Sequence, residues 1–220
     1  NTAFAKYGAE VLGAEKIRAM ATKFGFESTP TIDRDEKNTC FRVAESTVGS
    51  MTNTPGKNDP AATAQSSIGQ FEVVMTPLQG AMIAASVANN GSQMRPYLVQ
   101  QLKAADLTTV HYTAQTKELR RSISEQQAKD LQAMMISVVE KGSGKNARIS
   151  GFQVGGKTGT AENATEQESH GWFLAFAMKN GKPVIATTVF LENAGKGGSA
   201  EAARIAGQIM KAYIAEKGLA

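Results

Sequence analysis

Apolar residues in the first half of the chain follow a helical spacing, interrupted by one long stretch of turn-forming residues. Residues 2–24 carry apolar side chains at helical intervals, so we expect two short helices joined near Gly13. Residues 27–67 are rich in turn formers, which predicts a long loop with one short hairpin. A helix that is apolar nearly all round then begins after Thr76 and ends at Asn89. Its lack of a polar face implies deep burial.

The middle of the chain predicts two short strands and one strongly marked helix. Tyr97–Leu102 and Val110–Thr113 have strand-like composition. Ser124–Lys141 predicts an amphipathic helix, because Ser124 and Gln127 have the spacing of a capping box.

Three further strands and a closing helix are expected in the last third. The strands are Phe152–Ala161, Trp172–Lys179 and Val184–Glu192, and the last two flank Asn180-Gly181, a dipeptide typical of tight hairpin turns. Ser199 is expected to cap a final amphipathic helix. Because helices come first and an antiparallel sheet with a closing helix follows, the order predicts an α+β fold.

Composition narrows the class of protein. The 220 residues suit one sizeable domain, and a net charge of +4 is too small to favour a nucleic-acid partner. The single cysteine, Cys40, excludes an internal disulfide framework, while His111 and His170 belong to no metal-ligand pattern. We therefore expect neither a metal nor an organic cofactor. The sequence contains no run of about 18 apolar residues, so it predicts no membrane span.

The densest cluster of candidate functional residues is Gly155–Glu162. One interpretation is a phosphate-binding loop, because Gly151–Thr158 matches the pattern GxxxxGK[ST]. Such a loop binds phosphate between a strand and a helix. Here polar residues precede Gly151 and an aromatic strand begins at Trp172, so a nucleotide-binding protein is the weaker alternative.

The stronger interpretation rests on Lys157-Thr158-Gly159, followed by Thr160-Ala161-Glu162. This run resembles the KTG motif of penicillin-binding protein transpeptidase domains, whose other marks are SxxK and SxN. Asn1 matches the Asn of SxN, and the resemblance extends to about Tyr213. Several more stretches resemble the monofunctional class B branch, and within it we expect the actinobacterial A type. These stretches are Ser67-Ile68-Gly69-Gln70, Thr76-Pro77-Leu78-Gln79, Asn89-Asn90-Gly91 with Arg95-Pro96, His170-Gly171-Trp172-Phe173 and Gly197-Gly198-Ser199-Ala200.

The chain also departs from the family pattern. It contains no SxxK, and the nearest imitation, Thr54-Pro55-Gly56-Lys57, falls in a predicted loop. We therefore expect residues 1–220 to be the C-terminal portion of a single transpeptidase domain, with the nucleophile upstream and absent from this chain. Phe71 stands where the family often has glycine, so an altered turn is expected there. Cys40 is expected either to be buried or to pair with an upstream cysteine.

The resemblance implies a fold and a function. The fold is that of penicillin-recognising enzymes, an antiparallel sheet between helices with the helix from Thr76 at its centre. The function is D,D-transpeptidation of peptidoglycan stem peptides through an acyl-serine, with β-lactams as covalent inhibitors and the N-terminal remainder of the protein as a partner. The expected location is the extracytoplasmic face of the membrane, with an anchor upstream, in cell-wall synthesis during growth or division. A β-lactam sensor or a β-lactamase of the same fold is the alternative.

The resemblance also assigns roles to five residues. Lys157 and Asn1 are the expected catalytic residues: the lysine steers a carboxylate and biases a serine's proton transfers, and the asparagine binds the substrate amide. Thr158, Gly159 and Thr160 are the expected substrate-binding residues, on a strand edge to which an extended peptide can add. The Thr160 backbone N–H would be one oxyanion donor. Gly155, Gly156 and Gly159 are expected to leave room for that peptide. In contrast, Trp172, Phe173 and Phe176 are expected in the core.

Overall fold

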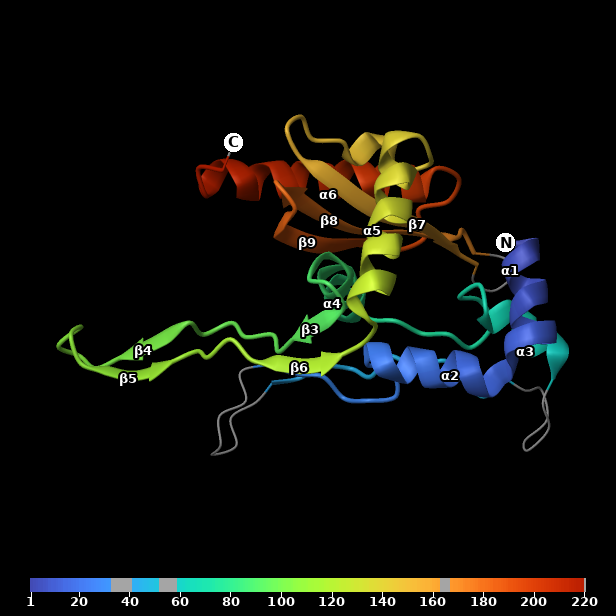
Figure 1. The fold of residues 1–220 in the computed structure, drawn as a ribbon, viewed down its shortest axis with the longest axis horizontal. Helices are drawn as coiled ribbons and strands as arrows, with labels where there is room; N and C mark the ends of the chain where they lie inside the picture. The colour runs from blue at the N-terminus through green and yellow to red at the C-terminus, as the bar shows by residue number, and fades with distance from the viewer. Residues whose placement is uncertain (33–40, 52–58, 163–166, 220) are drawn as a thin grey trace.

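The computed structural model describes residues 1–32, 41–51, 59–162 and 167–219 (Figure 1). Cys40 and Thr54–Lys57 lie outside these residues, so the expectations for them stay predictions. The helices are α1 (Thr2–Tyr7), a π-helical stretch (Gly8–Leu12), α2 (Gly13–Phe24), α3 (Pro60–Ser66), α4 (Pro77–Ala88), α5 (Glu125–Glu140), a 3-10 turn (Lys145–Ala147) and α6 (Gly198–Glu216). The strands are β1 (Thr31–Ile32), β2 (Phe41–Arg42), β3 (Ser92–Met94), β4 (Gln101–Lys103), β5 (Val110–Thr113), β6 (Glu118–Arg121), β7 (Gln153–Ala161), β8 (His170–Lys179) and β9 (Lys182–Leu191).

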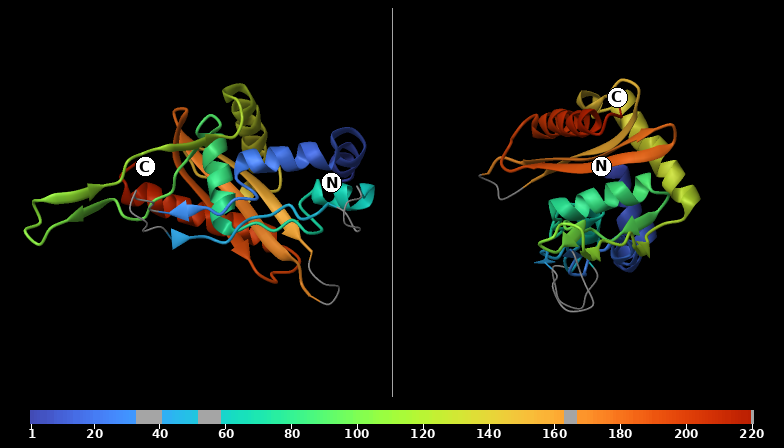
Figure 2. Two further views of the ribbon diagram at one scale, coloured as in Figure 1. Left: turned by 90° about the horizontal axis from the view of Figure 1, so that it is seen from below. Right: turned by 90° about the vertical axis from the view of Figure 1, so that its left-hand side faces the viewer.

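An antiparallel sheet of β7, β8 and β9, with β8 in the middle, is the centre of the described fold. Asn180 and Gly181 join β8 to β9 with φ values of 52° and 74°, as expected for a tight hairpin turn. Figure 2 shows the sheet between two helices, with α6 on one face and α4 on the other. The predicted α+β fold, with the helix after Thr76 packed centrally, is confirmed.

Side chains of the sheet alternate between these two helices. Phe173 and Val154 pack with α6 in one apolar cluster, while Phe176 and Met178 pack with α4 in a second cluster. Both phenylalanines are fully buried, as expected from the sequence. The alternation follows from the two-residue period of a strand. Successive residues of β7 therefore face the α4 side and the α6 side in turn.

Helix α5 covers the outer side of β7. Its capping box forms as predicted: the Ser124 hydroxyl accepts from the Gln127 N–H at 3.2 Å, and the Gln127 side chain accepts from the Ser124 N–H at 3.0 Å. Val139 of α5 joins the cluster on the α6 side, and Leu131 and Met135 join the one on the α4 side. Because α5 contributes side chains to both clusters, it crosses the edge of the sheet that β7 forms, near the start of that strand.

Three short elements escaped the sequence analysis. Helix α3 begins within the predicted loop, where the Asp59 carboxylate accepts from the N–H groups of Ala61 and Ala62. This Asp-Pro start is an ordinary helix signal that turn composition obscured. Strands β3 and β6 are too short to show a period, and they pair with each other although residues 95–117 separate them in the chain. Between them, the β4–β5 hairpin projects away from the rest of the described fold (Figure 1).

The start of α6 differs from the prediction. Ser199 does not cap this helix; Gly197 occupies the cap position with φ 95°, which favours glycine. Most residues on the buried face of α6 are small, whereas Ile209 is 44% exposed. Small side chains let α6 approach the sheet closely; they are Ala202, Ala203, Ala206 and Gly207. Within the described part of the chain, no helix combines the length and apolar character needed to span a membrane.

Candidate active site

A cleft of about 530 Å³ lies between the second half of β7 and the turn that follows α3. Asn1 lies at this cleft, next to the end of β7 (Figure 1). The structure therefore brings together all five residues that the sequence singled out. The lining residues are Asn1, Phe26, Ile68, Gly69, Gln70, Val73, Met75, Lys157, Thr158, Gly159, Thr160, Ala161, Trp172 and Leu174.

Strand β7 is an edge strand of the sheet, and its side chains divide between two sides of this edge. Lys157 lies opposite Leu174 in the register, and Gly159 lies opposite Trp172, both on the α4 side. Thr158 and Thr160 alternate with them, so their hydroxyls are on the α6 side. Charge and hydroxyl groups thus reach the same edge from opposite faces of one strand.

Two glycines of β7 have a different role from the expected one. A Cβ on Gly155 would lie 2.2 Å from the Phe176 ring, and a Cβ on Gly156 would lie 2.2 Å from the Phe173 ring. Both glycines are buried. They make room for core aromatic rings, so the expectation that they leave space for a bound peptide is wrong. Gly159 alone of the three lines the cleft.

Gln70 holds the far end of β7, a contact that the sequence analysis did not predict. Its Nε2 donates to the Thr160 carbonyl at 3.0 Å, and its Oε1 accepts from the Glu162 N–H at 3.3 Å. The Thr160 carbonyl therefore points away from β8. Since the N–H and C=O of one strand residue point to the same side, the Thr160 N–H also faces the open edge. The signal for Gln70 was present in Ile68-Gly69-Gln70, but only as a turn.

The turn that carries Gln70 continues into Phe71, which has φ 65°. Glycine adopts this left-handed conformation without steric cost, which accounts for the glycine that the family often has at this position. Next to it, the Glu72 carboxylate accepts from the backbone N–H and the hydroxyl of Ser50, each at 2.7 Å. These bonds, the hydroxyl first, lower the pKa of Glu72 below its ordinary value. Side-chain hydrogen bonds of Gln70 and Glu72 therefore hold the turn on either side of Phe71, and the expectation of an altered turn stays a prediction.

Polar and aromatic groups complete the edge. The Lys157 ammonium donates to the Thr158 carbonyl, which places its charge at the open side of β7. Trp172 lines the cleft and packs on Phe190 at 4.5 Å between ring centroids, so the expectation that it is purely a core residue is wrong. Its place beside Gly159 explains this, because a glycine leaves the indole open to the cleft. His170 Nδ1 accepts from the Asn193 N–H at 2.9 Å and thereby anchors a loop.

The phosphate-loop interpretation does not survive the structure. Gln153–Thr158 are strand residues that pair along β8, and no residue described between β7 and β8 is helical. Backbone N–H groups in a paired strand alternate in direction, so they cannot converge on one phosphate. Among the described residues, no group of three metal-ligating side chains lies together.

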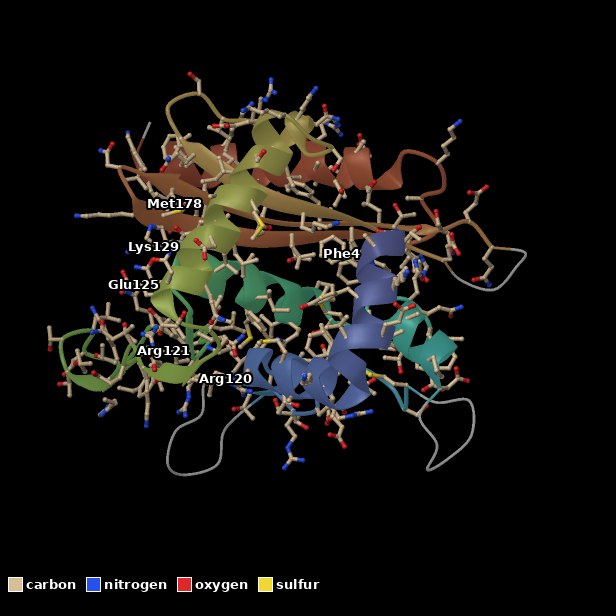
Figure 3. All side chains as sticks on the ribbon, turned by 45° about the vertical axis from the view of Figure 1, so that its right-hand side comes forward. Phe4, Arg120, Arg121, Glu125, Lys129 and Met178 are labelled. Carbon is tan, nitrogen blue, oxygen red and sulfur yellow. The ribbon has the colours of Figure 1, made fainter. Side chains whose placement is uncertain are left out.

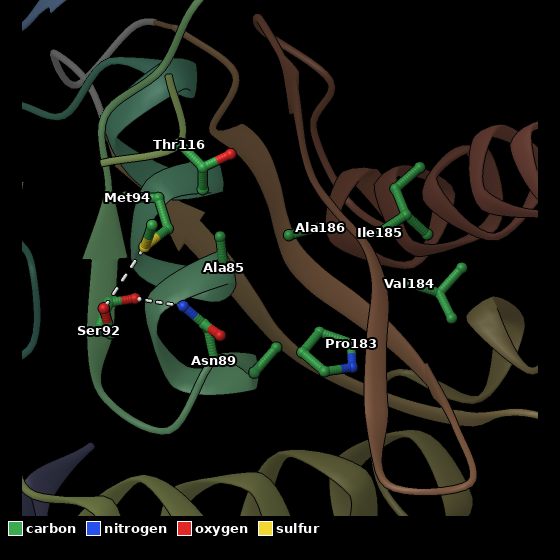
Figure 4. Close-up of a pocket in the computed structure, with 10 residues that line it drawn as sticks. Ala85, Asn89, Ser92, Met94, Thr116, Pro183, Val184, Ile185 and Ala186 are labelled. Atoms are coloured by element: carbon green, nitrogen blue, oxygen red, sulfur yellow. Dashed lines mark hydrogen bonds between the residues drawn. The ribbon is translucent and has the colours of Figure 1, made fainter. Parts of the chain in front are cut away.

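A second hollow, of about 380 Å³, lies between α4, β3 and β9 (Figure 4). Its polar groups already have partners: the Asn89 amide donates to the Ser92 carbonyl at 3.2 Å, and the Ser92 hydroxyl donates to the Glu118 carboxylate, which lies outside the hollow. The remaining lining is apolar apart from Thr116, and it includes no acid or base. The cleft at β7 is therefore the candidate active site.

A lysine, an asparagine and two threonines at the edge of an antiparallel sheet, with an apolar helix on one face and a second helix on the other, define a penicillin-recognising acyltransferase fold. The profile of the penicillin binding protein transpeptidase domain matches residues 1–211. The chain belongs to this family.

Individual relatives agree with the class B, actinobacterial interpretation. The chain is 40% identical over 218 residues to the peptidoglycan D,D-transpeptidase PbpA of Mycolicibacterium smegmatis, covering 98% of this chain and 41% of that protein. The crystal structure of PBPA from Mycobacterium tuberculosis superposes with a TM-score of 0.82 at 38% identity, covering 97% of this chain and 46% of that one. The ceftriaxone acyl-enzyme complex of the same protein gives a TM-score of 0.83. The chain thus spans less than half the length of these relatives.

Proposed function

We propose that this chain forms part of a peptidoglycan D,D-transpeptidase that works through an acyl-serine, and that it supplies the KTG strand and the Asn of SxN. The observation that carries the proposal is the convergence of Lys157–Thr160 and Asn1 on one cleft at an open strand edge. The nucleophilic serine and its lysine base come from the SxxK segment, which this chain does not contain.

The open edge of β7 suits an extended peptide. Main-chain groups of a peptide can pair with outward groups of an edge strand, which holds the scissile carbonyl in register. The Thr160 N–H is one oxyanion donor in this proposal, and the orientation that Gln70 gives the Thr160 carbonyl supports it. Donors that are fixed before the reaction stabilise the developing charge most, because they need no reorganisation.

The charged and polar side chains divide the remaining work. Lys157 attracts the substrate carboxylate and biases the proton transfers of the serine. The hydroxyls of Thr158 and Thr160 donate to that carboxylate, and Asn1 binds the substrate amide across the cleft. Stem peptides are the substrates and β-lactams the covalent inhibitors, in the extracytoplasmic space beside the membrane. Acyl-enzyme complexes of the M. tuberculosis relative with imipenem, ceftriaxone and penicillin G support this assignment.

The test uses the complete protein and a fluorescent penicillin. We expect Lys157→Ala to lower the acylation rate by on the order of 10²–10³, the loss typical of one preorganised electrostatic group. Stability should barely change, because Lys157 is exposed. Lys157→Arg should recover only part of the rate, since its planar head is bulkier. Lys182→Ala, at the exposed start of β9, is the matched control.

Near-normal acylation of Lys157→Ala would remove the lysine from the mechanism. Absence of any acylation of the complete wild-type protein would overturn the transpeptidase proposal itself. Rapid release of hydrolysed penicillin would instead identify a β-lactamase of the same fold, so turnover is measured on the same samples.

A further inference from the structure

The hydroxyls of Ser143 and Thr158 lie 2.7 Å apart, within hydrogen-bonding distance. Ser143 follows α5, whereas Thr158 belongs to the KTG run of β7, so the contact joins two elements at the open strand edge. The sequence pattern gave Ser143 no role.

The backbone on both sides of Ser143 is firmly placed. The N–H groups of Gly142 and Gly144 each donate to the Val138 carbonyl at 3.0 Å. A Cβ on Gly144 would lie 3.1 Å from the Phe173 ring, so this residue rests directly on the core of the sheet. Ser143 itself is exposed. Its hydroxyl is therefore presented to solvent and to Thr158 by a segment whose own position is determined by the core.

Ser143 adds a third hydroxyl to the side of the edge that carries Thr158 and Thr160. The Lys157 ammonium lies at the Thr158 carbonyl, so positive charge is close to this group of hydroxyls. A hydroxyl has a single proton to donate. If Thr158 gives its proton to Ser143, none remains for a ligand; if Ser143 donates to Thr158, the Thr158 proton is free.

We propose that Ser143 is a positioning residue for carboxylate recognition at β7, an inference that rests on the proposed function. Its hydroxyl donates to Thr158 Oγ1, so that the Thr158 proton points to the carboxylate of a bound peptide or β-lactam. A chain of two hydroxyls ending on an anion polarises in one direction, which strengthens both bonds. Without Ser143, the Thr158 hydroxyl is free to rotate away from the ligand.

The experiment measures acylation of the complete protein by a penicillin and by its methyl ester, which lacks the carboxylate charge. We expect Ser143→Ala to lower the second-order acylation rate by about 3- to 10-fold for the penicillin, the loss of one hydrogen bond. The ester should react equally with both proteins, and Ser143→Thr should restore the penicillin rate. Ser150→Ala, an exposed serine in the same connection, is the control. In a Thr158→Val background, Ser143→Ala should have no further effect.

Equal losses with penicillin and ester would overturn the inference, because they would show a general structural role. An unchanged penicillin rate in Ser143→Ala would overturn it too, as would an additive loss in the Thr158→Val background. Failure of the wild-type protein to react with either probe would overturn the proposed function and this inference together, which distinguishes that result from the others.

Discussion

Thr160 combines two proposed functions in one residue, since its N–H faces the open edge and its hydroxyl lies on the same side of β7 as that of Thr158. The backbone function is independent of the side chain, whereas the hydroxyl can be removed by substitution. Thr160 is exposed, so its contribution to the core is small.

We expect Thr160→Val to weaken acylation of the complete protein by about 1.5–3 kcal/mol, or roughly 10- to 150-fold, the effect of one charge-assisted hydrogen bond. Thr160→Ser should keep most of the activity because it retains the hydroxyl. Acylation rates and melting temperatures of both variants provide the measurement. If Thr160→Val reacted as fast as the wild-type protein, the hydroxyl would have no part in the site. The substitution would then be neutral or slightly stabilising, because valine favours a strand.

At the scale of elements, the Gln70 carboxamide holds the end of β7 to the turn after α3. It makes two bonds with residues about 90 positions further along the chain, at Thr160 and Glu162. In doing so it occupies edge groups that a neighbouring strand would otherwise take. A peptide that adds to β7 is thereby limited to the part of the edge before these bonds.

We expect Gln70→Ala to speed amide hydrogen exchange at Glu162 on the order of 5- to 10-fold, because a bond of about 1 kcal/mol protects that N–H. Gln70→Glu keeps an acceptor for the Glu162 N–H and should retain part of the protection. Hydrogen exchange followed by mass spectrometry of peptides containing residue 162 tests this, with Gln208→Ala on the exposed side of α6 as the control. Unchanged exchange in Gln70→Ala would contradict the clamp.

The tip of the β4–β5 hairpin depends on one carboxylate. Asp106 accepts from the Thr109 hydroxyl at 2.6 Å and from the N–H groups of Thr109 and Thr108 at 2.8 and 2.9 Å. These bonds, the hydroxyl first, lower the pKa of Asp106 from 3.8 to about 2. A lowered pKa means that the charged form stabilises the folded turn. That stabilisation is complete above pH 3.8 and is lost as the pH falls through about 2.

Titration of the Asp106 carboxyl by NMR is therefore expected to give a pKa near 2, and the Thr109 amide should lose protection over the same pH range. Asp106→Asn has no titrating group and should remove this step from the pH profile of the hairpin. A measured pKa at or above 3.8 would show that the turn does not hold the carboxylate.

At the scale of the whole molecule, the first two helices are incompletely covered. Neither α1 nor α2 contains a buried residue, and Phe4 of α1 is 73% exposed (Figure 3). Tyr7 and Val11 are also more than half exposed. Apolar side chains gathered in this way favour burial against further protein. Helix α5 differs, because its outer face carries charge: Glu125 and Lys129 form an exposed ion pair at 2.7 Å (Figure 3).

We expect these 220 residues, produced alone, not to be acylated by a fluorescent penicillin, because no SxxK occurs in them. They should also bind a hydrophobic dye such as ANS, since the α1 and α2 side chains are open to solvent. The complete protein is the positive control for labelling and the low-dye reference. Labelling of the 220-residue chain would place a nucleophile within it and would overturn our motif assignment.

Local sequence signals predicted those parts of the fold that neighbouring residues control. The capping box at Ser124, the turn at Asn180-Gly181 and the β7–β9 strands all formed as expected, because backbone preferences and side-chain periodicity act within a few residues. The order of the predicted helices and strands likewise indicated the α+β class. The KTG run lies on β7, the strand that borders the candidate cleft, and it was visible in the sequence because a motif is a local pattern.

Tertiary structure alone decided which groups meet at the site. Gln70 and Thr160 are 90 positions apart, and Ser143 reaches Thr158 only because α5 ends beside β7. Gly155 likewise makes room in the core for the ring of Phe176, which belongs to the neighbouring strand β8. A periodic pattern records which face a residue occupies, but not which residue from elsewhere in the chain lies against it. Contacts between distant segments follow from packing, and only the folded arrangement of α5, β7 and the turn after α3 determines them.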